Sequence, residues 1–155
     1  MKKTENALVI LAGGNGSRFG KKLPKQFTQI NGENLINFFL KGIDTNNFDK
    51  IVIVSKTSYL KYLKKLEYDF PSVKFIFVKA GKDRQSSSYN GLKSLKFFNP
   101  KNVLIHDAAR PFCSNNLIIK ILKSLKKNSS AIPYIFNTDK KMISKKDFNQ
   151  NIKLI

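Results

Sequence analysis

Short apolar runs rich in β-branched residues alternate along this chain with segments in which apolar residues recur every three or four positions. Runs of the first kind are typical of buried parallel strands, and segments of the second kind are typical of helices packed against a sheet. This alternation predicts an α/β fold with a mainly parallel sheet flanked by helices. The predicted strands are residues 7–11, 51–55, 73–78, 103–106 and 131–136. The predicted helices are residues 35–43, 58–66, 85–98 and 115–126.

The third and fourth predicted helices have the clearest apolar faces. The spacing of Tyr89, Leu92 and Leu95 predicts that these side chains face inward. Ser114 precedes the fourth helix and is suited to cap it. The inward positions expected in that helix are Leu117, Ile118, Ile121, Leu122 and Leu125. Because no internal repeat or Pro/Gly/Ser-rich linker interrupts the sequence, we expect residues 1–155 to form a single domain.

The first predicted strand runs into the glycine-rich sequence AGGNGSRFG. The strand would place this loop at the carboxyl edge of the sheet, where open α/β folds bind ligands. Gly13, Gly14 and Gly16 allow a close approach to an anion and offer backbone N–H donors. Arg18 and Lys25 add positive charge nearby. A tight strand-to-helix turn would also explain the glycines if the loop stood alone.

The loop matches neither of the two best-known nucleotide-binding patterns. Phe19 stands where a dinucleotide fingerprint has glycine, and Lys22 follows Lys21 where a P-loop requires Ser or Thr. The sequence therefore indicates something other than a Rossmann dehydrogenase or a P-loop NTPase.

The three arginines of the chain stand out among its 29 basic residues, because each follows an apolar run. They are Arg18 in GGNGSR, Arg84 in GKDR and Arg110 in HDAAR. The planar guanidinium binds phosphate in a bidentate way that lysine cannot copy. The three positions suggest that the three arginines belong to one anion site. The alternative is that their placement is due to chance.

Two further motifs follow the third and fourth predicted strands. In KAGKDRQSSSYNGL, serines 86–88 begin a helix, and their hydroxyls can cap it, bind a sugar or base over its N-terminus, or do both. In HDAARPF, Asp107 is well placed to hold Mg²⁺ together with substrate phosphates. Pairing with Arg110, which would fix the loop, is the structural alternative for Asp107. We expect His106 to be packed or hydrogen-bonded, and not to be a catalytic base.

The net charge of +19 would ordinarily suggest nucleic-acid binding. The lysines, however, are spread over every predicted helix and loop, and no aromatic residues interleave with them to stack bases. We therefore expect no specific nucleic-acid partner. The apolar runs are too short to span a bilayer, no signal-peptide pattern follows Met1, and Cys113 is the single cysteine. These features predict a cytoplasmic protein without a membrane partner.

Taken together, AGGNGSRFG, LPKQF, GKDRQSS and HDAARPF resemble the 2-C-methyl-D-erythritol 4-phosphate cytidylyltransferase family, in the same order, over residues 7 to about 135. The resemblance implies a three-layer, Rossmann-like fold of the GT-A type. It also implies transfer of CMP from CTP to a sugar-alcohol phosphate, with release of pyrophosphate, in isoprenoid precursor biosynthesis. Ribitol 5-phosphate cytidylyltransferases share GSR and PKQF, but the two alanines of HDAARPF favour the isoprenoid enzyme.

The resemblance further implies roles for single residues. Arg18 and Lys25 would stabilise the charge on the pentacoordinate phosphorus, and Asp107 would carry Mg²⁺. The residues expected around the nucleotide are Ala12, Gly13, Gly14, Asn15, Gly16, Gly81, Asp83, Arg84, Ser87 and Ala108. The sequence offers no Ser/His/Asp arrangement and no Cys/His cluster, so a covalent nucleophile has no evident candidate.

Family members are longer than this chain, and their additional carboxyl-terminal part completes the sheet and the acceptor site. We therefore expect a C-terminally incomplete domain that has the CTP half of the site without the acceptor half. Residues 137–155 resemble a projecting β-arm that clasps a second subunit, which predicts a homodimer. Thr138 and Asp139 receive no role, because the register of NTDKKM is ambiguous. A non-catalytic nucleotide-binding or assembly module is the alternative from a different class.

Overall fold

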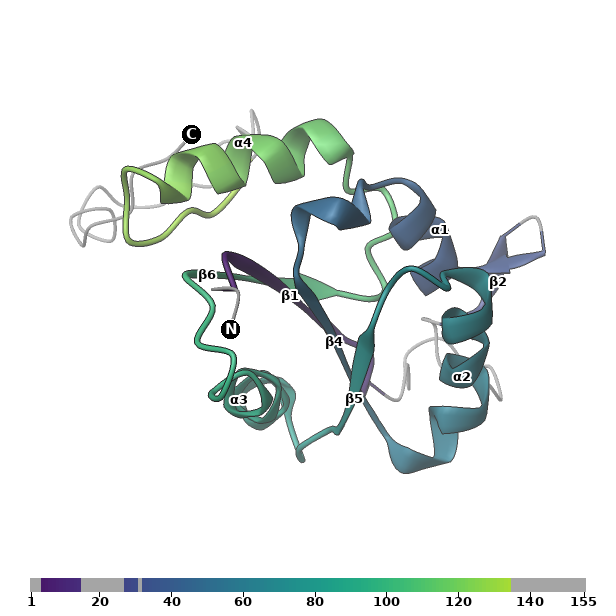
Figure 1. Ribbon diagram of the computed structural model, residues 1–155. Helices are drawn as coiled ribbons and strands as arrows, with labels where there is room; N and C mark the ends of the chain where they lie inside the picture. Colours follow the sequence, from purple (N-terminus) through teal and green to yellow (C-terminus); the bar gives the residue numbers. More distant parts are fainter. Residues whose placement is uncertain (1–3, 15–26, 31, 135–155) are drawn as a thin grey trace, which may run out of the picture. The chain divides into compact units, whose positions relative to one another are not determined.

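Four parallel strands form the sheet of the first of two compact units, residues Met1–Cys113 and Ser114–Ile155 (Figure 1). The computed structural model describes residues 4–14, 27–30 and 32–134. In spatial order, the strands are β5 (Phe75–Lys79), β4 (Lys50–Ser55), β1 (Asn6–Leu11) and β6 (Asn102–Asp107). A separate antiparallel hairpin joins β2 (Gln29–Ile30) to β3 (Glu33–Asn34). The predicted α/β architecture with a mainly parallel sheet is confirmed.

Strand β1 is central because both of its edges are paired. Val9 lies opposite Val52 on β4 and opposite Ile105 on β6. The four inner residues of β1 are fully buried. A continuous apolar run is what a strand covered on both faces requires, since neither face meets water.

Helices cover both faces of this sheet, which gives the three layers that the resemblance implied (Figure 1). One face carries α1 (Leu35–Lys41) and α2 (Leu60–Asp69), and the other carries α3 (Arg84–Ser94). Val9, Val52 and Val54 form a cluster with Leu95 on the α3 side. Because side chains alternate along a strand, Leu8 and its neighbours in register point to the α1–α2 side.

The contact of α3 with the sheet differs from the prediction. Leu95 is buried as expected, but Tyr89 is 63% exposed and Leu92 is 40% exposed. The inward position one turn before Leu95 is Gly91, where an added Cβ would lie 2.6 Å from the Val9 side chain. The prediction for Tyr89 and Leu92 was wrong because the helix approaches the valines through a glycine, which the spacing of apolar residues does not reveal.

Several helix boundaries also differ from the predicted ranges. A 3-10 turn, η4 (Thr57–Tyr59), precedes α2, and a second one, η3 (Thr45–Asn47), lies between α1 and β4. Gly42 caps the end of α1 by donating to the carbonyls of Phe38 and Phe39. Helix α3 ends before the predicted residue 98, because Leu95 and Phe98 donate to carbonyls three residues earlier in tight turns.

The described part of the second unit contains α4 (Asn115–Leu125). The Ser114 side chain accepts from the N–H of Leu117, so the predicted cap is confirmed. Of the five apolar residues predicted to face inward, Ile118 is buried and the others are half-buried. Residues 131–134 are not in a strand, so the prediction of a fifth strand was wrong for them, and Pro133 has no N–H to donate to a ladder.

No helix in the described ranges combines the length and the apolar character that crossing a bilayer would require.

Candidate active site

The carboxyl ends of β1, β5 and β6 bring three of the sequence motifs to one edge of the sheet. The N–H of Ala12 donates to the carbonyl of Val54 on β4 (2.8 Å), and the N–H of Ala108 donates to the carbonyl of Leu11 on β1 (3.0 Å). Ala80 extends β5 toward β4 in the same way (2.9 Å). Ala12 and Ala108 are buried, so these two predicted nucleotide-site residues set the direction in which their loops leave the sheet.

The glycine loop after β1 packs closely against the turn after β5. A Cβ added to Gly13 would lie 2.5 Å from the Cβ of Ala80, so no side chain fits there without a shift. Gly14 is exposed, and an added Cβ would have no atom within 4 Å. Packing therefore requires glycine at the first position, whereas the open space at the second permits a ligand to approach the backbone.

Asp107, the last residue of β6, is held between two arginines that come from different motifs. Its Oδ1 lies 3.0 Å from Nη2 of Arg84 and accepts a hydrogen bond from Nε of the same residue (3.1 Å). Its Oδ2 lies 3.3 Å from Nε of Arg110. The pairing of Asp107 with Arg110 was foreseen as an alternative, and Arg84 is an additional partner. Two of the three arginines predicted to form one anion site thus meet at a single carboxylate.

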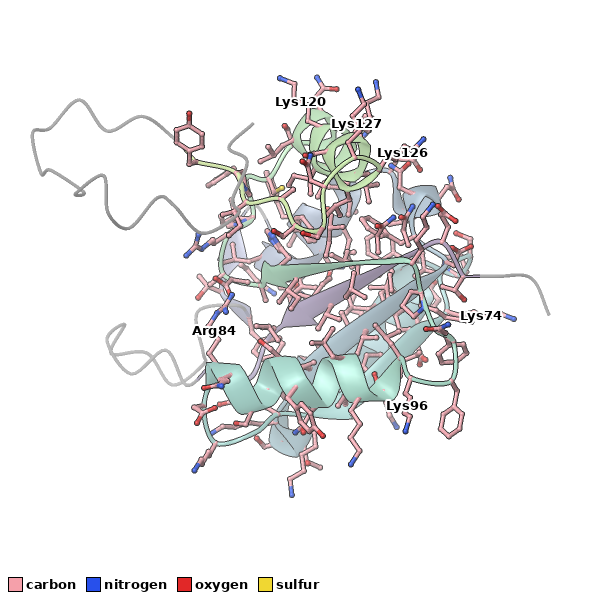
Figure 2. All side chains as sticks on the ribbon, turned by 90° about the vertical axis from the view of Figure 1, so that its left-hand side faces the viewer. Lys74, Arg84, Lys96, Lys120, Lys126 and Lys127 are labelled. Carbon is pink, nitrogen blue, oxygen red and sulfur yellow. The ribbon has the colours of Figure 1, made fainter. Side chains whose placement is uncertain are left out.

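This arginine cluster faces solvent and is net positive. The side chains of Arg84 and Arg110 are 66% and 79% exposed, against 27% for Asp107. Figure 2 shows Arg84 at the first turn of α3, pointing away from the helix axis. Two guanidinium groups and one carboxylate leave one positive charge, and each guanidinium has more N–H donors than the carboxylate uses. An incoming phosphate can therefore bind here without displacing buried groups.

A capping box opens α3. The Asp83 carboxylate accepts from the N–H of Ser86 (2.7 Å), and the Ser86 hydroxyl accepts from the N–H of Asp83 (3.1 Å). The hydrogen bond from the Ser86 hydroxyl is the main cause that lowers the pKa of Asp83. Capping was one of the roles left open for serines 86–88; Ser86 takes part in the capping box, but Asp83 is the capping residue itself.

Ser87 and Gly81 close the turn that leads into α3. The buried Ser87 hydroxyl accepts from the N–H of Gly81 (3.0 Å) and donates to the carbonyl of Asp83 (2.7 Å). A Cβ added to Gly81 would overlap the side chain of Ser86, with 2.6 Å to the Ser86 Cβ. These two predicted nucleotide-site residues therefore have a structural task in shaping the turn, and their contact with a nucleotide stays a prediction.

His106 is packed and hydrogen-bonded, as predicted. Its ring stacks on Phe39 of α1 with 3.9 Å between centroids and 12° between planes. Its Nε2 lies 3.0 Å from the carbonyl oxygen of Arg110, which ties the loop back to β6. Burial lowers the pKa of His106, because it disfavours the charged imidazolium. The stack on Phe39 was not foreseen, because no local spacing marks a contact between residues so far apart in the sequence.

The remaining predicted residues lie outside the described part of the chain. They are Asn15, Gly16, Arg18, Lys25, Thr138 and Asp139, together with the predicted arm at residues 137–155. Among the described residues, no three His, Cys, Asp or Glu side chains lie close enough to share a metal ion.

A parallel sheet that gathers a glycine loop, two arginines and a carboxylate at its carboxyl edge defines an α/β domain of the nucleotide-binding type. Comparison with known families is more specific. The family model "IspD: 2-C-methyl-D-erythritol 4-phosphate cytidylyltransferase" matches residues 6–152. The chain belongs to this family, as the resemblance of its motifs indicated.

Three curated relatives illustrate the similarity. The bifunctional enzyme IspD/IspF of Pelagibacter ubique is 41% identical over 139 residues, which are 86% of this chain and 35% of that protein. The 2-C-methyl-D-erythritol 4-phosphate cytidylyltransferase of Thermotoga neapolitana is 36% identical over 137 residues, or 86% and 60% of the two chains. The D-ribitol-5-phosphate cytidylyltransferase of Xenopus tropicalis is 32% identical over 134 residues, which are 81% of this chain and 33% of that protein.

A solved structure shows the same fold. The 4-diphosphocytidyl-2C-methyl-D-erythritol synthase of Anaerococcus prevotii superposes with a TM-score of 0.73 at 23% identity, over 89% of this chain and 58% of that one. The chain thus spans between about one third and three fifths of the length of these relatives.

Proposed function

We propose that this chain carries the nucleotide site of a cytidylyltransferase that transfers CMP from CTP to 2-C-methyl-D-erythritol 4-phosphate. The observation that carries the proposal is the cluster of Arg84, Asp107 and Arg110 at the sheet edge where the glycine loop also begins. Because the chain spans only part of its relatives' length, the complete reaction is part of the proposal.

In the proposed reaction, a phosphate oxygen of the acceptor attacks the α-phosphorus of CTP. The bond from that phosphorus to the bridging oxygen breaks, and pyrophosphate leaves with the electron pair. Cationic side chains would stabilise the negative charge on the five-coordinate phosphorus, so no covalent intermediate with the protein is needed. Arg18 and Lys25 are the groups proposed for this role, and Arg84 and Arg110 offer donors for the other phosphates.

Asp107 is the proposed ligand for Mg²⁺. This ion commonly takes one or two protein carboxylates together with substrate phosphates and water, so a single aspartate suits its chemistry. Both carboxylate oxygens contact guanidinium groups, and binding of Mg²⁺ requires at least one arginine to turn toward the nucleotide phosphates. When bound, the ion would neutralise and orient the triphosphate.

Pyrophosphate release by the purified 155-residue chain tests this proposal. CTP and Mg²⁺ are supplied with 2-C-methyl-D-erythritol 4-phosphate, with ribitol 5-phosphate, or without an acceptor, and CTP binding is measured in the same samples. Release that depends on methylerythritol phosphate supports the proposal and contradicts the expectation of a missing acceptor half. CTP binding without release in any arm supports the alternative of a non-catalytic nucleotide-binding module, and absence of CTP binding contradicts both.

Both cytidylyltransferase types named above transfer CMP to a sugar-alcohol phosphate, so the acceptor arms of this assay decide between them. Release only with ribitol 5-phosphate would assign the chain to the second type. A homodimer formed through residues 137–155 and a cytoplasmic location are further proposals from the family resemblance. Light scattering of the purified chain tests the dimer, because deletion of residues 137–155 should then yield a monomer.

A further inference from the structure

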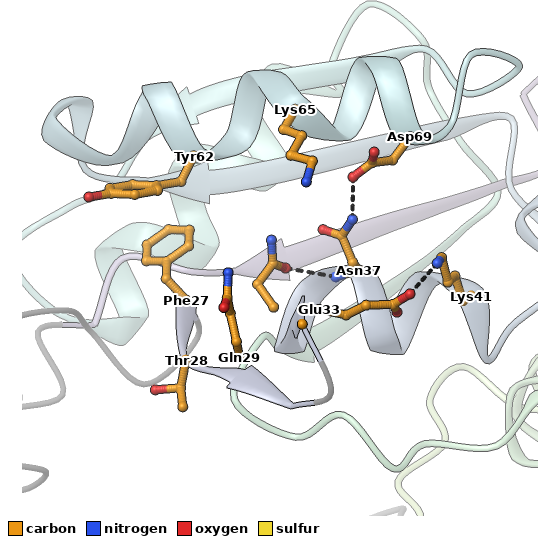
Figure 3. Close-up of a pocket in the computed structure, with 11 residues that line it drawn as sticks. Phe27, Thr28, Gln29, Glu33, Asn37, Lys41, Tyr62, Lys65 and Asp69 are labelled. Atoms are coloured by element: carbon orange, nitrogen blue, oxygen red, sulfur yellow. Dashed lines mark hydrogen bonds and ion pairs between the residues drawn. The ribbon is translucent and has the colours of Figure 1, made fainter.

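A cavity of about 830 Å³ opens between the β2–β3 hairpin, α1 and α2 (Figure 3). It is separate from the arginine cluster, since neither Gly13, Arg84 nor Asp107 lines it. Its volume lies within the range typical of small-molecule sites.

Asn37 of α1 leaves an unsatisfied acceptor in the wall of this cavity. The residue is 94% buried, and its Nδ2 donates to Oδ2 of Asp69 on α2 (2.5 Å). Its Oδ1 is fully buried and has no hydrogen-bond partner among the described residues. The amide cannot turn around, because a carboxylate accepts hydrogen bonds and would repel the carbonyl oxygen. A buried carbonyl oxygen without a donor is costly, so a group that donates a hydrogen bond to this atom would be favourable.

Aromatic rings form the opposite end of the cavity. Phe27 is 95% buried, and its ring lies 5.3 Å from the ring of Tyr62 on α2, with 32° between their planes. Figure 3 shows these two rings at one end of the cavity and the Asn37–Asp69 contact at the other. Such a site offers an apolar surface to carbon–hydrogen groups and hydrogen-bonding groups to polar atoms.

The charges of the described residues around the cavity balance, although the chain as a whole has a net charge of +19. The described lining contains two acids, Glu33 and Asp69, and two lysines, Lys41 and Lys65. Glu33 forms an ion pair with Lys41 across the hairpin and α1. A phosphate or another anion would find no excess of positive charge here, whereas the arginine cluster provides one.

We propose that this cavity binds a neutral polyol of monosaccharide size. A hydroxyl group both donates and accepts, so it can donate to Oδ1 of Asn37 and to Asp69 while it accepts from Lys65 or Gln29. The carbon–hydrogen face of the same molecule packs on Phe27 and Tyr62. The inference is independent of the proposed transferase activity, since it uses different residues and a different ligand.

Nuclear magnetic resonance titration of the ¹⁵N-labelled 155-residue chain tests this site. The probes are myo-inositol and D-glucose, and inorganic phosphate in a separate arm. We expect at least one polyol to shift the Asn37 side-chain amide signal in a saturable manner, with a Kd in the millimolar range, and phosphate not to do so. Absence of saturable shifts with both polyols up to about 100 mM, or shifts with phosphate alone, overturns the proposal.

Two variants and one control locate the binding. Tyr62→Leu removes the aromatic surface, and Asn37→Leu removes the acceptor at nearly constant volume; each should weaken polyol binding about tenfold. Lys64→Gln changes an exposed residue of α2 that does not line the cavity, and it should bind as the wild type does. Circular dichroism checks that each variant folds. If Asn37→Leu does not fold, the polyol affinity of Tyr62→Leu decides the test. Unchanged affinity in every folded cavity variant would contradict the proposal.

Discussion

The guanidinium group of Arg84 lies 3.0 Å from Oδ1 of Asp107 and so joins the first turn of α3 to the end of β6. The pair is solvent-exposed on the arginine side, and the second carboxylate oxygen contacts Arg110. An ion pair of this kind contributes little to stability, because water and salt screen it. Its position at the carboxyl edge of the sheet therefore points to ligand binding as the reason for gathering these charges.

Replacement of Asp107 by asparagine separates a role in stability from a role in ligand binding. We expect the free energy of unfolding to change by less than about 1 kcal/mol, because the ion pairs are exposed. Pyrophosphate release should fall at least about 100-fold, because the proposed Mg²⁺ ligand is lost. Denaturant unfolding and a pyrophosphate assay measure the two effects. Glu67→Gln, which removes an exposed carboxylate on α2, should alter neither quantity.

Arg18→Ala tests the proposed stabilisation of charge on the phosphorus. We expect turnover to fall by a factor of about 100 or more, since a neutral methyl group cannot replace the positive charge of a guanidinium group. The measurement is the rate of pyrophosphate release at saturating CTP. A folded Arg18→Ala protein that keeps the wild-type rate would remove Arg18 from the proposed mechanism.

Replacement by alanine should change the stability of the protein by different amounts at two glycines of the sheet edge. Gly81→Ala should destabilise the protein by about 1–3 kcal/mol, because the new methyl group overlaps Ser86 and disturbs the capping box. Gly14→Ala should change stability by less than about 1 kcal/mol, since no atom lies within 4 Å of the added Cβ. Thermal unfolding of both variants makes the comparison, and equal losses would mean that the turn at Gly81 adapts to a side chain.

Leu95 and Tyr89 test the observed orientation of α3. Leu95→Ala should cost about 2–5 kcal/mol, because it creates a cavity beside the valine cluster. Tyr89→Ala should cost less than about 1 kcal/mol, since that side chain is 63% exposed. Urea denaturation of the two variants measures both values. A larger loss for Tyr89→Ala than for Leu95→Ala would support the face predicted from the apolar spacing.

The stability of the chain should depend on pH through His106. Burial lowers the pKa of His106 in the folded state below its usual value of 6.5, so the unfolded chain binds a proton first as the pH falls. The contribution of neutral His106 to the free energy of unfolding is complete above about pH 6.5, and it declines as the pH falls from there through the folded-state pKa. We expect wild type to lose more stability than His106→Gln between pH 7 and pH 5, as measured by urea unfolding. Parallel pH profiles of the two proteins would exclude His106 as the titrating group.

Local patterns in the sequence predicted much of the architecture. The runs at residues 7–11 and 51–54 are apolar throughout, which is typical of strands covered on both faces, and the predicted bounds of β1 and β4 were correct to within one residue. Ser114 identified the start of α4 by its capping chemistry. The order of the glycine loop, GKDR and HDAAR after three strands also placed these motifs at one edge, since parallel strands share the direction in which they end.

The sequence by itself thus determined the α/β class, the family and the edge of the sheet at which the motifs lie, because apolar runs, capping residues and motif order can be read along the chain. Only the tertiary structure decided which side chains meet. It joined Arg84 and Arg110 through Asp107, stacked His106 on Phe39, and turned α3 so that Gly91 faces the sheet. Among the described residues, it also left Oδ1 of Asn37 without a donor beside Asp69. These contacts depend on how closely distant backbones approach, and no spacing within a single segment encodes that distance.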